Sequence, residues 1–282
     1  MKNTTLKKLK SLPFLGFGIG LRPKHYESLL ENPQQVDWLE IISENFMFDS
    51  GPTLEKLDEF KEKFTIIPHG VSLSIGSSDP LNFDYLKKLK KLIERLDPPW
   101  FSDHLCWTSY KKQNLHNLMP LPYTPETANY VAERIKIVQD FIEKPLLIEN
   151  VSSYVEFNQS TMPEWEFIGQ ISEKANCGLI LDVNNVFVSA FNHQFDPLTY
   201  INAIPPERVI QYHIAGHSDH ETYIVDTHDH DVREEVWTLF EKTVPRFGQV
   251  SVMIERDDNI PPLDEVLEEL NIAKEIWKSA HA

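Results

Sequence analysis

The chain of 282 residues is 41% hydrophobic and carries a formal net charge of −16. This apolar content is sufficient for a sizeable buried core, which excludes disorder as the default, and the acidic balance disfavours binding to nucleic acid. Cys106 and Cys177 are too few for a disulfide framework, and no apolar run reaches membrane-spanning length, so we expect a cytoplasmic protein that contacts no membrane.

Short apolar runs alternate along the chain with longer amphipathic stretches, a pattern typical of strand, crossover helix and parallel strand. We expect residues 1–15 to form an N-terminal arm and residues 16–282 to form one domain. The predicted strands cover residues 16–22, 36–43, 65–74, 100–107, 145–152, 177–186, 209–217 and 249–257. The clearest predicted helices cover residues 83–96, 127–142, 232–244 and 262–279.

Eight strand–helix units in a chain of this length predict an α/β fold of the closed (β/α)8 type, a single-domain TIM barrel. No Gly/Ser-rich linker or block of charge divides the chain into two domains. An open doubly wound sheet is the alternative. Its glycine-rich first turn is missing, because GFGIG at residues 16–20 follows no strand and opens no clear helix.

Histidine and acidic residues stand near the C-terminal ends of six successive predicted strands. In a TIM barrel these ends converge on one face, where active sites are built. Buried carboxylates at this face would repel one another unless cations neutralised them. The strand-end set is His69, His104, Glu149, Asp182, His213 and Glu255, and the segment after the seventh strand adds His217, Asp226 and His228.

These ligand types narrow the choice of metal. Imidazole and carboxylate without thiolate suit iron, manganese or zinc better than copper(I), and bridging carboxylates allow two or three ions.

Several structural roles remain open for single residues of this pattern. A single strand-end carboxylate could pair with a neighbouring arginine such as Arg256. Glu40 and Glu44 could hold a metal, bind substrate or cap a helix, and Cys106 is read as a small core residue.

Seven motifs extend this pattern over most of the chain. They are HGVSLSIG (69–76), FSDHLCW (101–107), LLIENVSSY (146–154), LILDVNNVFVSAFNH (179–193), QYHIAGH (211–217), DTHDH (226–230) and VMIERDDNIP (252–261). In this order they resemble the multinuclear non-heme iron-dependent oxidative enzymes, from about Gly16 to about Ile276. The resemblance implies a TIM barrel with two or three iron ions that uses dioxygen to oxidise cysteine residues of a ribosomally made peptide.

The resemblance also implies a ligand set and a partner. His69, His104, Glu149 and Glu255 resemble ligands around one pair of irons, with Asn184 and His213 completing the neighbouring ion. Asp182, His217, Asp226 and His228 resemble the ligands of a further ion. Zinc or manganese could replace iron in purified samples. No organic cofactor is needed, and no catalytic residue beyond the ligands is implied. A separately encoded protein would bind the peptide leader.

Two other classes of function remain open. The first is a metal-dependent hydrolase or isomerase, similar in ligand style to the trinuclear zinc endonucleases or the xylose isomerases, because His, Asp and Glu at strand ends serve those chemistries equally well. The acidic net charge counts against the nuclease form. The second is a non-catalytic metal-storage or scaffold protein. Metal analysis combined with oxygen consumption separates all of these classes.

Overall fold

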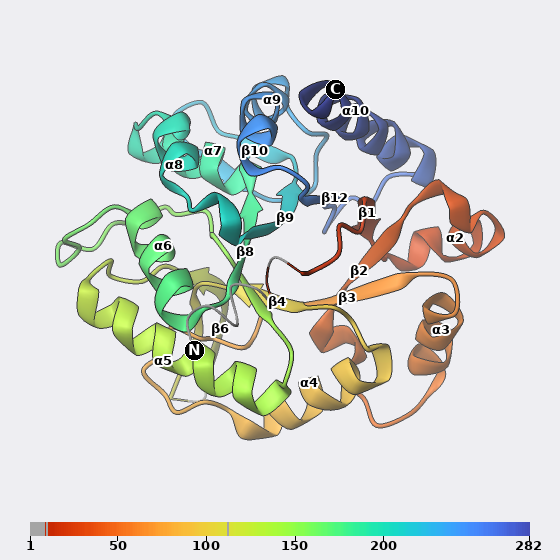
Figure 1. Ribbon diagram of the computed structural model, residues 1–282, viewed down its shortest axis with the longest axis horizontal. Helices are drawn as coiled ribbons and strands as arrows, with labels where there is room; N and C mark the ends of the chain where they lie inside the picture. Colours follow the sequence, from red (N-terminus) through yellow and green to blue (C-terminus); the bar gives the residue numbers. More distant parts are fainter. Residues whose placement is uncertain (1–8, 10, 112) are drawn as a thin grey trace.

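The computed structural model describes residues 9, 11–111 and 113–282. Parallel strands close into a barrel that helices surround (Figure 1). The eight barrel strands are β1 (Phe17–Gly20), β2 (Trp38–Ile42), β3 (Thr65–Gly70), β4 (Phe101–His104), β7 (Leu146–Glu149), β8 (Gly178–Asp182), β9 (Val209–Ile214) and β12 (Ser251–Ile254). Because β12 pairs with β1, the ring is closed, and the prediction of a single-domain (β/α)8 barrel is confirmed. Most of the predicted arm lies outside the described residues.

The outer layer consists of helices that connect successive strands (Figure 1). Its α-helices are α2 (Tyr26–Glu31), α3 (Pro52–Lys61), α4 (Phe83–Leu96), α5 (Pro125–Ile142), α6 (Glu164–Ala175), α7 (Val183–His193), α8 (Pro197–Ala203), α9 (Glu234–Phe247) and α10 (Leu263–His281). Single 3-10 turns are η1 (Pro23–His25), η2 (Pro33–Gln35), η3 (Ser43–Phe46) and η4 (Pro206–Arg208). No helix in the described part of the chain is both long and apolar enough to span a membrane.

Two antiparallel hairpins extend from the C-terminal ends of the barrel strands. The first pairs β5 (Trp107–Tyr110) with β6 (Gln113–Met119), and the second pairs β10 (His217–Asp219) with β11 (Ile224–Asp226). The predicted strands 100–107 and 209–217 each ran into one of these hairpins, so the structure corrects their C-terminal ends.

The predicted strand 177–186 was also too long. The strand ends at Asp182, and α7 begins at Val183. Asp182 Oδ1 accepts a hydrogen bond from the backbone N–H of Asn185 at 2.6 Å, which caps the first turn of the helix. The apolar run from 177 to 186 is compatible with a strand or with a helix, and the capping hydrogen bond at Asp182 favours the helix from Val183 onward.

The inside of the barrel has an apolar floor. Its six buried residues are Trp38, Ile67, Trp100, Leu147, Ile180 and Met253, all contributed by the barrel strands or the residue directly before one. A second and larger cluster fills the layer between strands and helices. Both faces of the sheet are therefore apolar, as expected for a parallel barrel. The floor closes the barrel interior below the C-terminal ends of the strands, which we call the mouth.

Gly18 provides the space that the Trp38 ring occupies in this floor. A Cβ at position 18 would lie 2.5 Å from Cε2 of Trp38, a contact that a rigid indole cannot relieve without moving. We expect Gly18→Ala to lower the free energy of unfolding by about 1–3 kcal/mol, measured by urea denaturation.

Gly169→Ala is the matched control for this prediction. Gly169 lies within α6, and a Cβ there would meet only Pro205, at an ordinary distance of 3.6 Å. This variant should be neutral or more stable by up to about 1 kcal/mol, because alanine favours a helix interior over glycine. Equal stability of the two variants would contradict the packing argument.

Candidate metal centre

The polar mouth lies directly above the apolar floor. Alternate residues of a strand point to the same face, so the residue two positions beyond a floor residue also points inward. On β2, β3, β7, β8 and at the end of β12, these positions hold Glu40, His69, Glu149, Asp182 and Glu255. All five residues are buried, and His104 on β4 and His213 on β9 are buried beside them.

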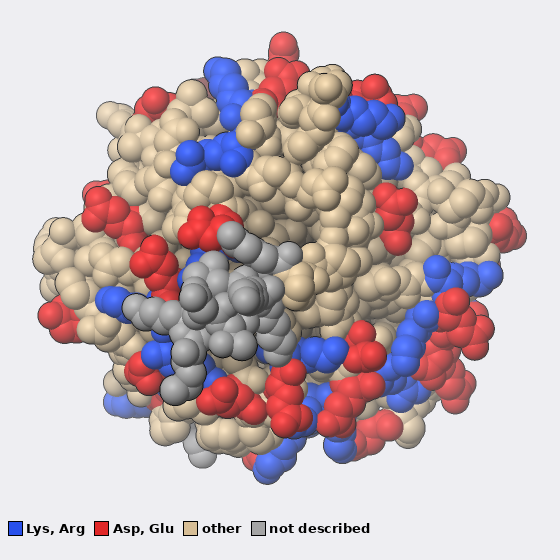
Figure 2. Space-filling view, in the orientation of Figure 1, with Lys and Arg blue, Asp and Glu red and all other residues tan. Residues whose placement is uncertain are grey.

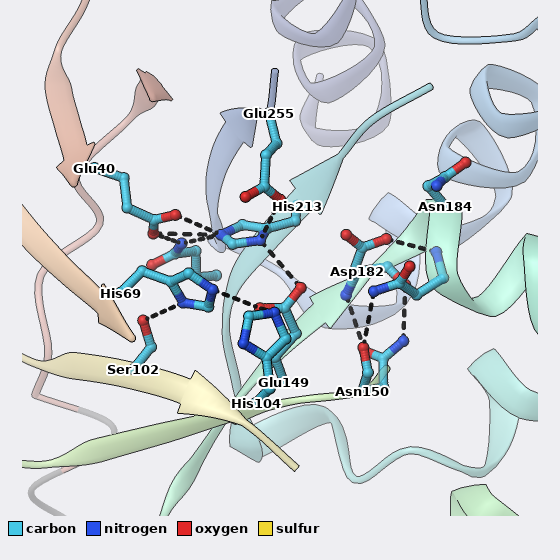
Figure 3. Close-up of polar contacts among 12 residues, drawn as sticks. Glu40, His69, Ser102, His104, Glu149, Asn150, Asp182, Asn184, His213 and Glu255 are labelled. Carbon is cyan, nitrogen blue, oxygen red and sulfur yellow. Dashed lines mark hydrogen bonds and ion pairs between the residues drawn. The ribbon is translucent and has the colours of Figure 1, made fainter. Parts of the chain in front are cut away.

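Glu149 is at the centre of the mouth, where three histidines converge on its carboxylate (Figure 3). Its Oε2 lies 3.3 Å from Nε2 of His69 and 3.6 Å from Nε2 of His104. Its Oε1 lies 3.2 Å from Nδ1 of His213. The structure thus brings together side chains from β3, β4, β7 and β9 around one carboxylate.

Hydrogen bonds to the opposite ring nitrogens orient two of these imidazoles. Nδ1 of His104 donates to the carbonyl of Gly70 at 3.0 Å, and Nδ1 of His69 lies 2.9 Å from Oγ of Ser102. The hydroxyl of Ser102 donates to a carbonyl, so its oxygen can accept from His69. When these rings are neutral, both Nε2 atoms face Glu149 with a free lone pair, the arrangement typical of histidines that bind metals.

Glu255 and Asp182 complete the inner part of the site. Glu255 Oε2 lies 3.1 Å from Nδ1 of His213. Single ligand atoms of Glu149, Asp182, His213 and Glu255 all lie within 4.8 Å of one another, close enough to surround an ion. Since Oδ1 of Asp182 caps α7, its Oδ2 is the oxygen left for this inner group.

The β10–β11 hairpin explains why the segment after β9 is rich in histidine and aspartate. Its register places His217 directly opposite Asp226. Asn184 on α7 joins the two, because its Nδ2 donates to Asp226 Oδ1 at 2.8 Å and its Oδ1 lies 2.8 Å from His217 Nδ1. Nε2 of His228 lies 2.6 Å from the same Asp226 oxygen. These four residues form an outer group beside the inner one.

His228 connects the outer group to the inner group. Its Nδ1 lies 3.3 Å from Glu255 Oε2 and 3.1 Å from Asp257 Oδ2. His228 has a φ of 50°, a left-handed conformation that is rare for a residue with a side chain and is found preferentially at functional sites. Asp257 is in turn held by Arg22, whose Nη2 donates to Oδ1 at 2.6 Å.

Four buried ligand atoms in these groups make no well-aligned hydrogen bond, although three of them lie within 2.6–3.3 Å of another ligand atom. They are His69 Nε2, Glu149 Oε2, Asp182 Oδ2 and His228 Nε2. An unpaired polar atom in a protein interior is costly, so the arrangement calls for an additional partner. Among the described residues, no lysine or arginine forms an ion pair with Glu149, Asp182 or Glu255. Imidazole nitrogens and carboxylate oxygens fit iron, manganese or zinc, so the buried clusters could hold metal ions.

The pKa values of the inner residues show how strongly they interact. Burial opposes ionisation of Glu149, but attraction to His213 and His104 outweighs it and lowers the pKa of Glu149 to about 2. Burial also disfavours a charged His213, yet Glu149, Glu40 and Glu255 hold its pKa well above the ordinary value. A metal ion at this carboxylate would therefore replace protons carried by the imidazoles.

The pKa values of Asp182 and His228 are also strongly shifted, for opposite reasons. Burial, reinforced by repulsion from Glu149, raises the pKa of Asp182 well above its usual range. At His228, burial is outweighed by attraction to Asp226 and Glu255, which raises the pKa of the imidazole well above its usual value. Perturbed titratable groups gathered in one mouth are typical of functional sites.

Two acidic residues of the mouth were not predicted as part of the site. Glu40 was left open, although its position two residues beyond Trp38 on β2 carries the same period-two signal as the predicted set. Asp257 lies three residues beyond the end of β12, where the strand period no longer applies, and its contact with His228 reveals it.

Other residues whose roles the sequence leaves open act elsewhere. Arg256 pairs with Asp231 and Glu269, each at 2.7 Å, so Glu255 is not neutralised by its neighbour. Glu44 accepts from the backbone N–H of Ser72 at 2.8 Å and holds the loop after β3. Cys106 is fully buried in the core, as predicted.

The closed barrel, with buried histidines and carboxylates at its mouth, places this chain in the class of TIM-barrel proteins. Among solved structures, a xylose isomerase-like TIM barrel protein from Mycobacterium smegmatis in complex with magnesium aligns with a TM-score of 0.61 and 14% identity, covering 97% of this chain and 99% of that one. The 3-keto-D-glucoside 4-epimerase of E. coli aligns with a TM-score of 0.59 and 12% identity, covering 93% and 99%. At these identities the similarity shows the fold alone.

Sequence comparison then defines the family. A model described as RiPP precursor modification enzyme MbnB/TglH/ChrH matches residues 16–278, and the chain belongs to this family. UPF0276 proteins of Caulobacter vibrioides (strain NA1000 / CB15N) and Anaeromyxobacter sp. (strain Fw109-5) are each 49% identical, covering 94% and 95% of this chain and 95% of their own lengths. A UPF0276 protein of Vibrio parahaemolyticus is 39% identical, covering 89% of both chains.

Proposed function

We propose that this protein is a multinuclear non-heme iron enzyme that uses dioxygen to oxidise cysteine residues of a ribosomally made peptide. The observation that carries the proposal is the convergence of four buried ligand atoms without a well-aligned hydrogen bond, in the mouth of a barrel from a peptide-modifying family. Iron, when bound, would supply redox chemistry with dioxygen and lower the pKa of a coordinated cysteine thiol.

The contacts support a division of the ligands into two sets. His69, His104, Glu149, Asp182, His213 and Glu255 would hold the inner ions, with Glu149 shared between them. Asn184, His217, Asp226 and His228 would hold an outer ion. This division moves Asn184 to the outer set and Asp182 to the inner set, because Asn184 contacts both His217 and Asp226 whereas Asp182 approaches Glu149 and His213.

The protein would contribute ligands that are buried and already oriented. Ser102 and Gly70 hold the rings of His69 and His104, so these ligands are oriented before any ion arrives. The apolar floor excludes water from below. A peptide would reach the mouth from the side of the two hairpins, because these hairpins extend from the same strand ends as the ligands.

A separate leader-binding protein is part of the proposal. The family description supports a precursor peptide as the substrate. The net charge of −16 favours a substrate or partner with some positive charge. On the face shown in Figure 2, acidic and basic side chains of the described residues are interspersed without a continuous basic area, which does not favour nucleic acid. The buried free thiols of Cys106 and Cys177 suit a reducing cytoplasm.

The proposal is tested by metal analysis and oxygen uptake on protein purified without oxygen and loaded with ferrous iron. The substrate for the assay is a cysteine-bearing peptide encoded beside this gene, with its Cys→Ser version as the control. We expect bound iron, oxygen consumption and a mass change only with the cysteine peptide. Bound zinc without oxygen uptake would instead support the hydrolase or isomerase class, and bound metal without any turnover would support storage.

A further inference from the structure

The β10–β11 hairpin, which supplies part of the outer set, is held by side chains from two other elements. Ile224 and Asp226 both lie on β11, and their backbone N–H groups donate to residues outside the hairpin. Ile224 exchanges two hydrogen bonds with the side-chain amide of Asn192 on α7, at 2.9 and 3.0 Å. Asp226 donates to the hydroxyl oxygen of Tyr154 at 2.9 Å. The position of the hairpin therefore depends on α7 and on the loop after β7.

The loop after β7 presents Tyr154 on an anchored segment. The backbone N–H of the neighbouring Ser153 donates to Oγ of Ser189 on α7 at 3.1 Å. The hydroxyl of Ser153 lies 2.6 Å from Nε2 of His193, at the end of the same helix. Both serines are buried, whereas Tyr154 is 46% exposed. The contacts of the Tyr154 hydroxyl connect this anchored loop to the hairpin.

The hydroxyl of Tyr154 belongs to a closed ring of hydrogen bonds that starts and ends at Asp226. The backbone N–H of Asp226 can only donate, so the oxygen of Tyr154 accepts. The hydroxyl of Ser152 donates to Oδ2 of Asp226 at 3.3 Å. Because Ser152 has a single hydroxyl hydrogen, it accepts in its 3.0 Å contact with Tyr154, and Tyr154 donates. The direction of the bonds is consistent around the whole ring.

This ring orients the carboxylate of Asp226 relative to its own backbone. Its Oδ1 accepts from Nδ2 of Asn184 at 2.8 Å and lies 2.6 Å from Nε2 of His228. Its Oδ2 accepts from Ser152, in the longest bond of the ring. A carboxylate oxygen can accept more than one bond, so Oδ2 retains a lone pair for an ion. Metal-binding carboxylates are typically held in this way by residues that do not touch the metal.

We propose that Tyr154 is a positioning residue for the outer ion: through the ring with Ser152, its hydroxyl holds both the backbone and the carboxylate of Asp226. The inference rests on the proposed outer ion but on neither iron nor oxygen chemistry. Tyr154 is not itself a ligand, because its oxygen accepts from the backbone and its hydrogen is donated to Ser152. Loss of a residue that orients a metal ligand typically weakens metal affinity about 10–100-fold.

The first test measures hydrogen exchange at the backbone amide of Asp226 by NMR, in the full-length protein with and without zinc. Tyr154→Phe keeps the aromatic ring and removes the acceptor of this N–H. We expect exchange to become about 2–10-fold faster, the factor that corresponds to the net contribution of one hydrogen bond. Unchanged exchange would overturn the inference.

Tyr110→Phe is the matched control for this substitution. Tyr110 lies on β5 and is 47% exposed, and its hydroxyl makes no hydrogen bond to another described residue. The same chemical change at the same exposure should therefore leave the exchange of the Asp226 amide as in the wild type. Equally fast exchange in both variants would show that the ring of hydrogen bonds does not protect this amide, and would contradict the inference.

The second test measures cobalt binding, with His217→Ala as the variant that identifies the outer ion. This variant should lose one ion, and the absorption bands that disappear with it belong to the outer site. In Tyr154→Phe we expect the wild-type number of ions, with the outer ion bound about 10–100-fold more weakly and the inner ions unchanged. Wild-type affinity for the outer ion would overturn the inference. Loss of that ion even at high cobalt concentration would also overturn it, because Tyr154 would then be a ligand.

A double variant tests whether Tyr154 acts through Ser152. Ser152→Ala removes the donor to Oδ2 of Asp226 and should also weaken binding of the outer ion. If the two hydroxyls act as one ring, the double variant should bind about as weakly as the weaker single variant, whereas independent effects multiply. Multiplied losses, or equal weakening of the inner and outer ions, would contradict the ring and indicate general damage to the mouth.

These outcomes separate the inference from the proposed function. An outer ion that depends on Tyr154, in a protein that consumes no oxygen with any cysteine peptide, would support the inference and refute the oxidase. Oxygen consumption by a Tyr154→Phe protein that binds the outer ion as tightly as the wild type would do the reverse. A His217→Ala protein that binds as many ions as the wild type would show that the outer ion is absent, which would overturn the inference and leave the oxidase to be decided by the inner ions.

Discussion

Glu149→Gln is expected to abolish binding of the inner metal ions while the barrel stays folded. Glutamine has the size of glutamate but cannot supply a charged, shareable carboxylate to His69, His104 and His213. Metal content by mass spectrometry should fall from roughly two or three ions per chain to at most one. Circular dichroism should be unchanged, since residues of the mouth contribute little to barrel packing.

Glu94→Gln is the control for this change. Glu94 is exposed on α4, so this substitution removes the same charge far from the mouth. Its metal content should match that of the wild type. A Glu149→Gln protein that kept all its ions would show that the central carboxylate is not a ligand, and the whole inner set would then have to be reconsidered.

Removal of the metal by a chelator is expected to lower the melting temperature by on the order of 10 °C. A ligand present at a thousand times its dissociation constant stabilises a protein by about 4 kcal/mol, and for a chain of this size each kcal/mol shifts the melting temperature by about 2–4 °C. The structural cause is the set of buried ligand atoms that make no well-aligned hydrogen bond. Scanning calorimetry before and after chelation, and after returning the metal, measures the shift.

The same chelation applied to Glu149→Gln provides the comparison. Because that variant binds few ions, its melting temperature should change little. A wild-type protein whose melting temperature is insensitive to chelator would contradict a metal centre that stabilises the mouth.

The sequence by itself determined the barrel and the residue types that gather at its mouth. Alternating strands and helices can cover both faces of a parallel sheet in few architectures. The barrel is the architecture in which the sheet closes on itself. His69, Glu149, Asp182 and Glu255 were found because strands have a period of two and their C-terminal ends meet. The local details were less secure. Strand 177–186 was too long, because a single side-chain cap at Asp182 turns an apolar run into a helix.

The tertiary structure alone decided which atoms act together. Gln211 and Glu40 are 171 positions apart in the chain, and no spacing reveals that the side-chain amide of Gln211 donates to the carboxylate of Glu40. The position of Asp257 likewise depends on a hydrogen bond from Arg22, a residue far away in the chain. Asn184 joins the outer set only because the β10–β11 hairpin aligns His217 with Asp226. Hydrogen bonds act over about 3 Å, so the roles of these residues are fixed only when the closed barrel brings distant segments together.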